Sequence, residues 1–95
     1  MSEPTIQVQQ TGTGEPMEFS VIVREGTTET RHQVTMKRAD HDRLTGGKVA
    51  AGRCIQAAFE FLLNHEPKES ILGGFDVSII ATYFPSFPRE IARYF

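Results

Sequence analysis

The stretch from residue 49 to residue 65 constrains the fold most strongly. It reads VAAGRCIQAAFEFLLNH, and its apolar residues recur every three or four positions, which predicts an amphipathic helix. At 100° per residue, Arg53, Gln56, Glu60 and Asn64 form one polar strip. The apolar arc covers about 200°, whereas a helix resting on one sheet needs only about 100–140°. We therefore expect two neighbours for this helix: a sheet, and either the C-terminal segment or another subunit.

The sheet is expected before this helix. Apolar and polar side chains alternate from Met17 to Arg24 and again from Arg31 to Lys37, with Gly26 in the turn between them. This pattern predicts a β-hairpin over residues 17–37, whose register stays open because the turn has no clean two-residue signature. Ile6 and Val8 alternate with glutamines and predict a short strand over residues 5–10.

Shorter helical segments are expected around and after the main helix. Residues 39–44 have room for a short helix that ends at a glycine pair, and Pro67 stops the main helix. Asp76 is a favourable N-cap with Phe75 before it, so we favour a helix that begins after Asp76 and ends at Pro85, although its β-branched residues also permit a strand. Pro88 fits the first turn of a last helix.

These elements predict a single α+β domain over residues 1–95. We expect a two- to three-stranded antiparallel sheet, built from the hairpin 17–37 and the strand 5–10. One main helix (49–65) and short C-terminal helices follow this sheet.

Composition narrows the classes of function. The net charge of −2 gives no field that attracts nucleic acid or an anionic membrane, although residues 24–53 carry seven bases against four acids. Cys54 is the only cysteine, so no internal disulfide is expected. No apolar run approaches the roughly 20 residues of a membrane span, and the first residues, MSEP, do not resemble a secretory signal. We expect a cytoplasmic protein without a membrane partner.

Neither metal binding nor catalysis is expected from the reactive side chains. Asp40, His41 and Asp42 are adjacent, and adjacent helical residues point 100° apart and do not converge on a metal. Cys54 and His65 lie about three turns apart on the predicted helix, too far for a thiol–imidazole pair. We therefore predict no catalytic, metal or cofactor-binding residue and no cofactor.

Two parts of the chain resemble a known family. The parts are the hairpin EFSVIVREG with TRHQVT, and the run FEFLLNHEPKESIL, which leads to Phe75-Asp76 and Tyr83-Phe84-Pro85. Over about residues 6–91 they look like a family of short uncharacterised bacterial proteins. That resemblance implies a bacterial source and a small domain, and it implies no activity. The chain departs from the family pattern at Gly73-Gly74, where a basic pair is expected.

The leading functional hypothesis is a small non-catalytic protein-interaction module that binds a protein partner or a second copy of itself. It is motivated by the wide apolar arc and by an aromatic-rich C-terminus, which could equally close the core of a monomer. The edge strand with Ile6 and Val8 is a second docking line. The candidate partner surface consists of Tyr83, Phe84, Phe87, Tyr94 and Phe95.

The alternative hypothesis is a weak nucleic-acid-binding protein. It would use the outer face of the hairpin, because a β-ribbon can enter a major groove. The candidate anion-binding residues are Arg24, Arg31 and Lys37. The negative net charge argues against this alternative.

Overall fold

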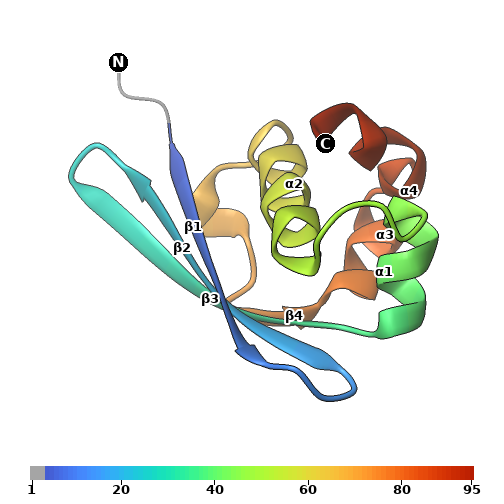
Figure 1. The fold of residues 1–95 in the computed structure, drawn as a ribbon. Coiled ribbons are helices and arrows are strands. Elements are labelled where there is room, and N and C mark those ends of the chain that lie inside the picture. The colour runs from blue at the N-terminus through green and yellow to red at the C-terminus, as the bar shows by residue number, and fades with distance from the viewer. Residues whose placement is uncertain (1–3) are drawn as a thin grey trace.

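The protein is built on a four-stranded sheet. The computed structural model describes residues 4–95, and its strands are β1 (Thr5–Gly12), β2 (Met17–Glu25), β3 (Thr28–Met36) and β4 (Gly74–Asp76). They lie side by side in chain order, so that β1 and β4 are the two edges. The first three strands are antiparallel, and β4 runs parallel to β3 (Figure 1).

The predicted hairpin is confirmed, and the structure fixes its register. Val21 lies opposite His32 and Phe19 opposite Val34, which places the alternating apolar residues of both strands on one face. The turn consists of Gly26 and Thr27, and Gly26 has a φ of 62°, which glycine adopts without steric cost. The opposite face of the sheet carries mainly polar side chains, with Ile22 as an apolar exception.

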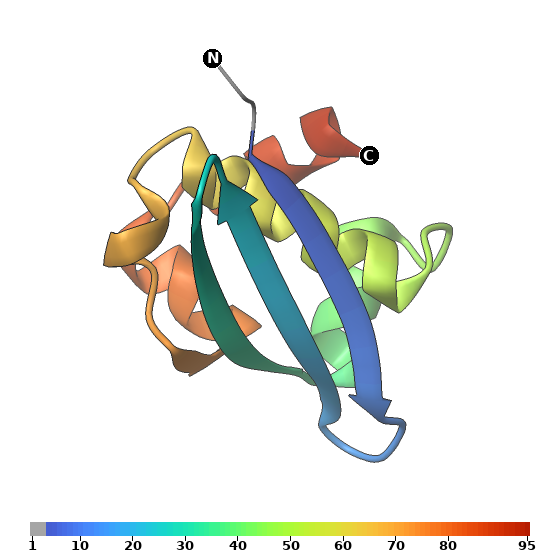
Figure 2. The same ribbon diagram turned by 90° about the vertical axis from the view of Figure 1, so that its left-hand side faces the viewer.

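All the helices cover the same face of the sheet, and the polar face stays open (Figure 2). This one-sided cover is usual for antiparallel sheets. The helical segments are α1 (Arg38–Thr45), α2 (Ala51–Leu63), η1 (Lys68–Ser70), η2 (Val77–Ile79), α3 (Ile80–Tyr83), α4 (Phe87–Glu90) and η3 (Ile91–Tyr94), where η denotes a 3-10 turn.

The main helix forms as predicted, as one continuous rod that is slightly shorter than the expected 49–65. Its wide apolar arc is explained within the chain. Ile55 and Phe59 are fully buried in the core, and Phe61 packs its ring against Phe84, Phe87 and Tyr94 of the C-terminal segment. The second neighbour of α2 is therefore the protein's own C-terminus.

The prediction of two or three antiparallel strands is wrong in part, because the sheet has a fourth, parallel strand. This strand was not expected, and it lies directly before the helical segment that Asp76 was predicted to cap. Asp76 does act as an N-cap, since its side chain accepts a hydrogen bond from the amide of Ser78. The backbone just before that cap is extended, and Phe75 pairs with Val34. Helix begins only beyond Asp76, first as η2 and then as α3.

A hydrophobic core fills the space between the sheet and the helical layer. It draws on β2, β3, α2 and the C-terminal segment, and its largest fully buried side chains include Phe19, Phe59, Phe61 and Phe87. Among residues 4–95, no helix has both the length and the hydropathy that a membrane crossing requires.

Candidate functional site

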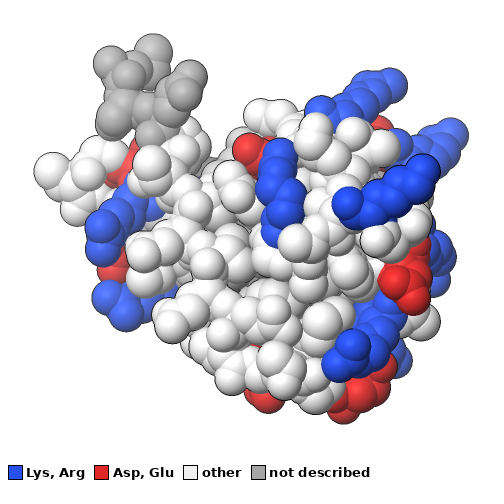
Figure 3. All heavy atoms as spheres, viewed as in Figure 1, with Lys and Arg blue, Asp and Glu red and all other residues white. Residues whose placement is uncertain are grey.

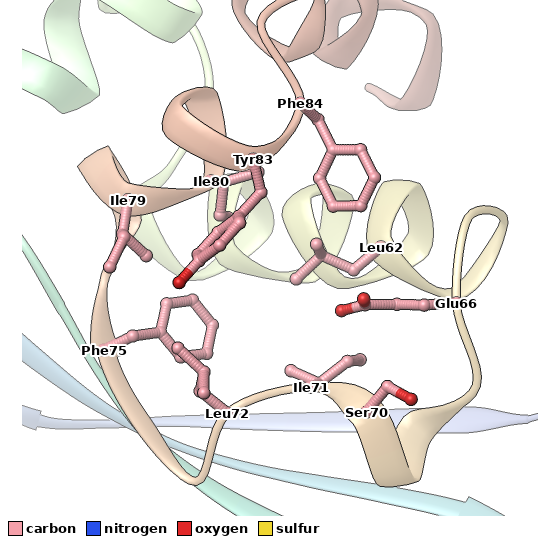
Figure 4. Close-up of a pocket in the computed structure, with 10 residues that line it drawn as sticks. All are labelled: Leu62, Glu66, Ser70, Ile71, Leu72, Phe75, Ile79, Ile80, Tyr83 and Phe84. Carbon is pink, nitrogen blue, oxygen red and sulfur yellow. The ribbon is translucent and has the colours of Figure 1, made fainter.

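An apolar groove lies between α2 and the β4 edge of the sheet. Its volume is about 410 Å³, and Figure 4 shows its walls. Leu72 and Tyr83 stand at its rim, with 47% and 64% of their surfaces exposed, so that the rim presents apolar surface from both to solvent. The lining residues are Leu62, Glu66, Ser70, Ile71, Leu72, Phe75, Ile79, Ile80, Tyr83 and Phe84.

The loop that forms one wall of the groove is fastened to β3 by its backbone. The carbonyl oxygen of Leu72 accepts a hydrogen bond from Nδ1 of the buried His32, at 2.7 Å. The other ring nitrogen of His32 lies 2.9 Å from the hydroxyl of Thr30. The amide of Gln33 donates to the carbonyl of Gly73 at 2.8 Å. The side chain of Leu72 can therefore face solvent while its backbone is held in place.

The floor of the groove continues into β4. The ring of Phe75 lies 6.0 Å from that of Phe59 on α2, which joins the groove to the core. Next to it, Oδ1 of Asp76 accepts a 2.6 Å hydrogen bond from the hydroxyl of Thr35. Burial opposes the charged form of Asp76, but hydrogen bonds from Thr35 and Ser78 outweigh it and lower the pKa of this carboxyl. Asp76 thus fastens β4 to β3 as an anion.

Glu66 brings a negative charge to this apolar surface. It follows α2, and its half-buried side chain points into the groove between Leu62 and Ile71 (Figure 4). Within residues 4–95 its carboxylate has no ion-pair partner. The carboxylate is therefore free to meet a cation that enters the groove.

The structure does not bring the five predicted aromatic residues together. Tyr83 and Phe84 line the groove. Phe87 is 1% exposed and belongs to the core, where no partner can reach it. Tyr94 packs on Phe61 and lies on the opposite flank of α2, and Phe95 is 39% exposed at the end of the described chain.

Sequence reasoning missed two features on this side of the molecule. Leu72 precedes a glycine pair and belongs to no apolar periodicity, so only its isolated position in a glycine-rich turn could have marked it. The side chain of Lys68 is only 3% exposed, and its ammonium lies 2.5 Å from a Glu69 oxygen and 3.7 Å from a Glu25 oxygen. No local pattern signals that burial.

Arg24 and Arg31 lie on the open face of the sheet and Lys37 directly follows β3, but each of the three has an acid nearby. Arg24 and Arg31 both contact Glu29, at 2.7 and 3.0 Å. The hydrogen bond from Arg24, followed by that from Arg31, holds the pKa of Glu29 below its ordinary value. The exposed Lys37 lies close enough to Asp76 to help lower the pKa of that carboxyl. The positive charge available to an anion is therefore small.

The histidine rings are hydrogen-bonded to the backbone, and the cysteine is buried. One ring nitrogen of each histidine donates to a backbone carbonyl: His32 to Leu72, His41 to Val49 and His65 to Phe61. Cys54 is fully buried, and burial raises the pKa of its thiol to about 11. No cluster of three or more metal-ligating side chains occurs in the described part of the chain.

Comparisons with known proteins leave the groove as the main guide to function. No family model matches the chain, and neither a curated protein nor a solved structure matches it. The resemblance to short bacterial proteins therefore stays a prediction.

Proposed function

We propose that this protein is a non-catalytic protein-interaction module whose groove receives an apolar segment of a partner protein. The observation that carries the proposal is the exposure of Leu72 and Tyr83 at the rim of a 410 Å³ apolar groove. Apolar surface of this kind, rimmed by polar groups, is typical of partner-binding sites. The proposal applies to one flank of α2 rather than to the whole aromatic C-terminus.

The openness of the groove favours a peptide over a small molecule. A pocket for a small ligand encloses about 70–90% of the ligand surface. Here Leu72 and Tyr83 keep 47% and 64% of their own surface in solvent, so a small molecule would stay largely exposed. A peptide can place one apolar side chain in the hollow and continue across the rim.

Charge complementarity defines the partner segment further. The Glu66 carboxylate points into the groove, and an acid beside an apolar contact favours a basic group on the partner. The occupant that we propose is therefore an apolar anchor residue with lysine or arginine next to it. A neutral or acidic neighbour would bind more weakly.

The test uses seven-residue peptides with two leucine anchors and a central lysine, glutamine or glutamate. We expect the lysine peptide to shift the amide NMR signals of the groove residues and to bind roughly five- to tenfold more tightly than the glutamate peptide. Tyr83→Ala should weaken all three peptides. Glu66→Gln should abolish the charge preference while binding of the glutamine peptide persists.

The matched control is Glu18→Gln, which removes an exposed carboxylate from β2 outside the groove lining. This variant should keep the lysine preference. If no peptide shifts groove signals at millimolar concentration, the proposed function is wrong. If the preference survives in Glu66→Gln, the peptide is not oriented by this carboxylate.

A further inference from the structure

Over residues 5–10 the free edge of β1 lacks the charges and prolines that usually keep edge strands apart. Natural edge strands carry charges, prolines or bulges, because unpaired backbone groups otherwise recruit another strand. From Thr5 to Gln10 the chain has no charged residue and no proline, and the register with β2 is regular up to the shift between Gln10 and Gly12. Six consecutive residues are thus available for pairing.

The inner side of this edge is incompletely covered. Ile6 and Val8 pack against the core but are only half-buried. A hollow of about 550 Å³ lies beside them, between β1 and α2, and Ile6 and Leu63 contribute apolar surface to it. Its remaining lining residues are Pro4, Thr5, Gln56, Glu60, Asn64 and Tyr94.

The charges around this hollow permit a like copy to approach. Glu60 is the one charged residue of its lining, and Arg53 lies 3.4 Å from that carboxylate. The face of the molecule that presents β1 shows a broad uncharged area, with charged groups of both signs at its two sides (Figure 3). Because residues 5–10 carry no charge, pairing along this strand places no like charges opposite each other.

From these observations we infer that β1 pairs antiparallel with β1 of a second copy, which joins the two sheets across a two-fold axis. This inference concerns a different surface from the groove and goes beyond the proposed function. A centre at Gln7 sets Ile6 of each copy opposite Val8 of the other, with Gln7 facing its own counterpart. Both half-buried apolar residues are then covered, because paired side chains lie on the same face.

Sedimentation of the full chain across micromolar to millimolar concentrations tests this inference. We expect a monomer–dimer equilibrium, and Gln7→Lys should weaken it by up to about fivefold by placing two ammonium groups opposite each other. Gln33→Lys is the matched control, because it makes the same change on the exposed face of β3, away from the β1 edge, and should leave dimerisation unchanged. Circular dichroism establishes that both variants are folded.

A second readout identifies the interface directly. In a mixture of isotope-labelled and unlabelled protein, we expect intermolecular NOEs between Ile6 and Val8. A wild-type monomer at millimolar concentration would overturn the inference, as would an equal response to Gln7→Lys and Gln33→Lys. A dimer broken by Tyr83→Ala but not by Gln7→Lys would also overturn it, because self-association would then use the groove.

Discussion

The two edges of the sheet are finished in different ways. At the β4 edge, a strand of three residues is bonded to β3 through backbone and side chains, and the loop before it builds the groove. At the β1 edge, an eight-residue strand ends the sheet with no other strand of the described chain beyond it. Beside β4, a partner would meet the side chains that line the groove. At β1, a partner would meet unpaired backbone hydrogen-bonding groups. One small sheet can therefore present two surfaces of different specificity.

The largest loss of folding stability is expected when the contact that joins α2 to the β4 edge is removed. Phe59 is fully buried between His32 and Phe75, with ring centroids 5.2 and 6.0 Å away. Phe59→Ala should lower the free energy of unfolding by about 3–5 kcal/mol through the lost burial and the cavity left behind. Leu63→Ala, on the β1 flank and only half-buried, should cost clearly less in the same urea titration. Equal losses would contradict the difference between the two edges.

A smaller loss of folding stability is expected when the hydrogen bonds to the Asp76 carboxylate of β4 are removed. Asp76→Ala removes the hydrogen bonds to Thr35 and Ser78 and should cost about 1–2 kcal/mol of unfolding free energy at pH 7. Because the pKa of Asp76 is lowered on folding, its contribution is present above its unfolded pKa and disappears as pH falls through the folded value. The gap between wild type and variant in urea titrations should therefore close in strong acid. A constant gap would show that the carboxylate charge is irrelevant.

The buried thiol of α2, the helix that both edges share, gives the next prediction. With the pKa of Cys54 raised from 9.0 to about 11, the unfolded chain loses the thiol proton at lower pH than the folded chain. Stability should therefore fall as pH rises from about 9 to 11, and Cys54→Ala should remove that part of the decline. At pH 8, the native thiol should react with iodoacetamide about 100-fold more slowly than the thiol in urea. Equal rates would mean that the helix opens readily.

The smallest effect is expected for DNA binding by the open face of the sheet, which lies between the two edges. Arg24 and Arg31 share the carboxylate of Glu29, so we expect no retardation of duplex DNA below about 0.1 mM protein at low salt. Glu29→Gln frees both guanidinium groups and should increase weak retardation slightly. Retardation of the wild type at micromolar concentration would support the nucleic-acid alternative instead.

The sequence predicted those parts of the fold that depend on near neighbours. The alternation around Phe19 and Val34 and the periodicity of α2 each lie within one continuous segment, so the hairpin and the main helix could be anticipated. The fourth strand could not, because Gly74 pairs with Gln33, 41 positions earlier, over only three residues. Parallel pairing of this kind leaves almost no local pattern.

Of the candidate site, only the involvement of C-terminal aromatic residues could be predicted from the sequence. An excess of C-terminal aromatic residues indicated an interaction surface, but composition could not tell which of them pack on Phe61. The structure directs Phe87 inward and leaves Tyr83 exposed, because the turn between α3 and α4 decides which rings reach the wide arc of α2. The role of Leu72 depends on its carbonyl contact with His32, 40 residues away.

That contact between His32 and the carbonyl of Leu72 has a consequence for binding thermodynamics. A flexible loop loses conformational entropy when a ligand immobilises it, and part of the binding free energy is spent on that ordering. The backbone on this side of the groove is already immobilised by a buried imidazole and a neighbouring amide hydrogen bond. A peptide would therefore enter a preorganised wall, and even a short segment could bind with useful affinity.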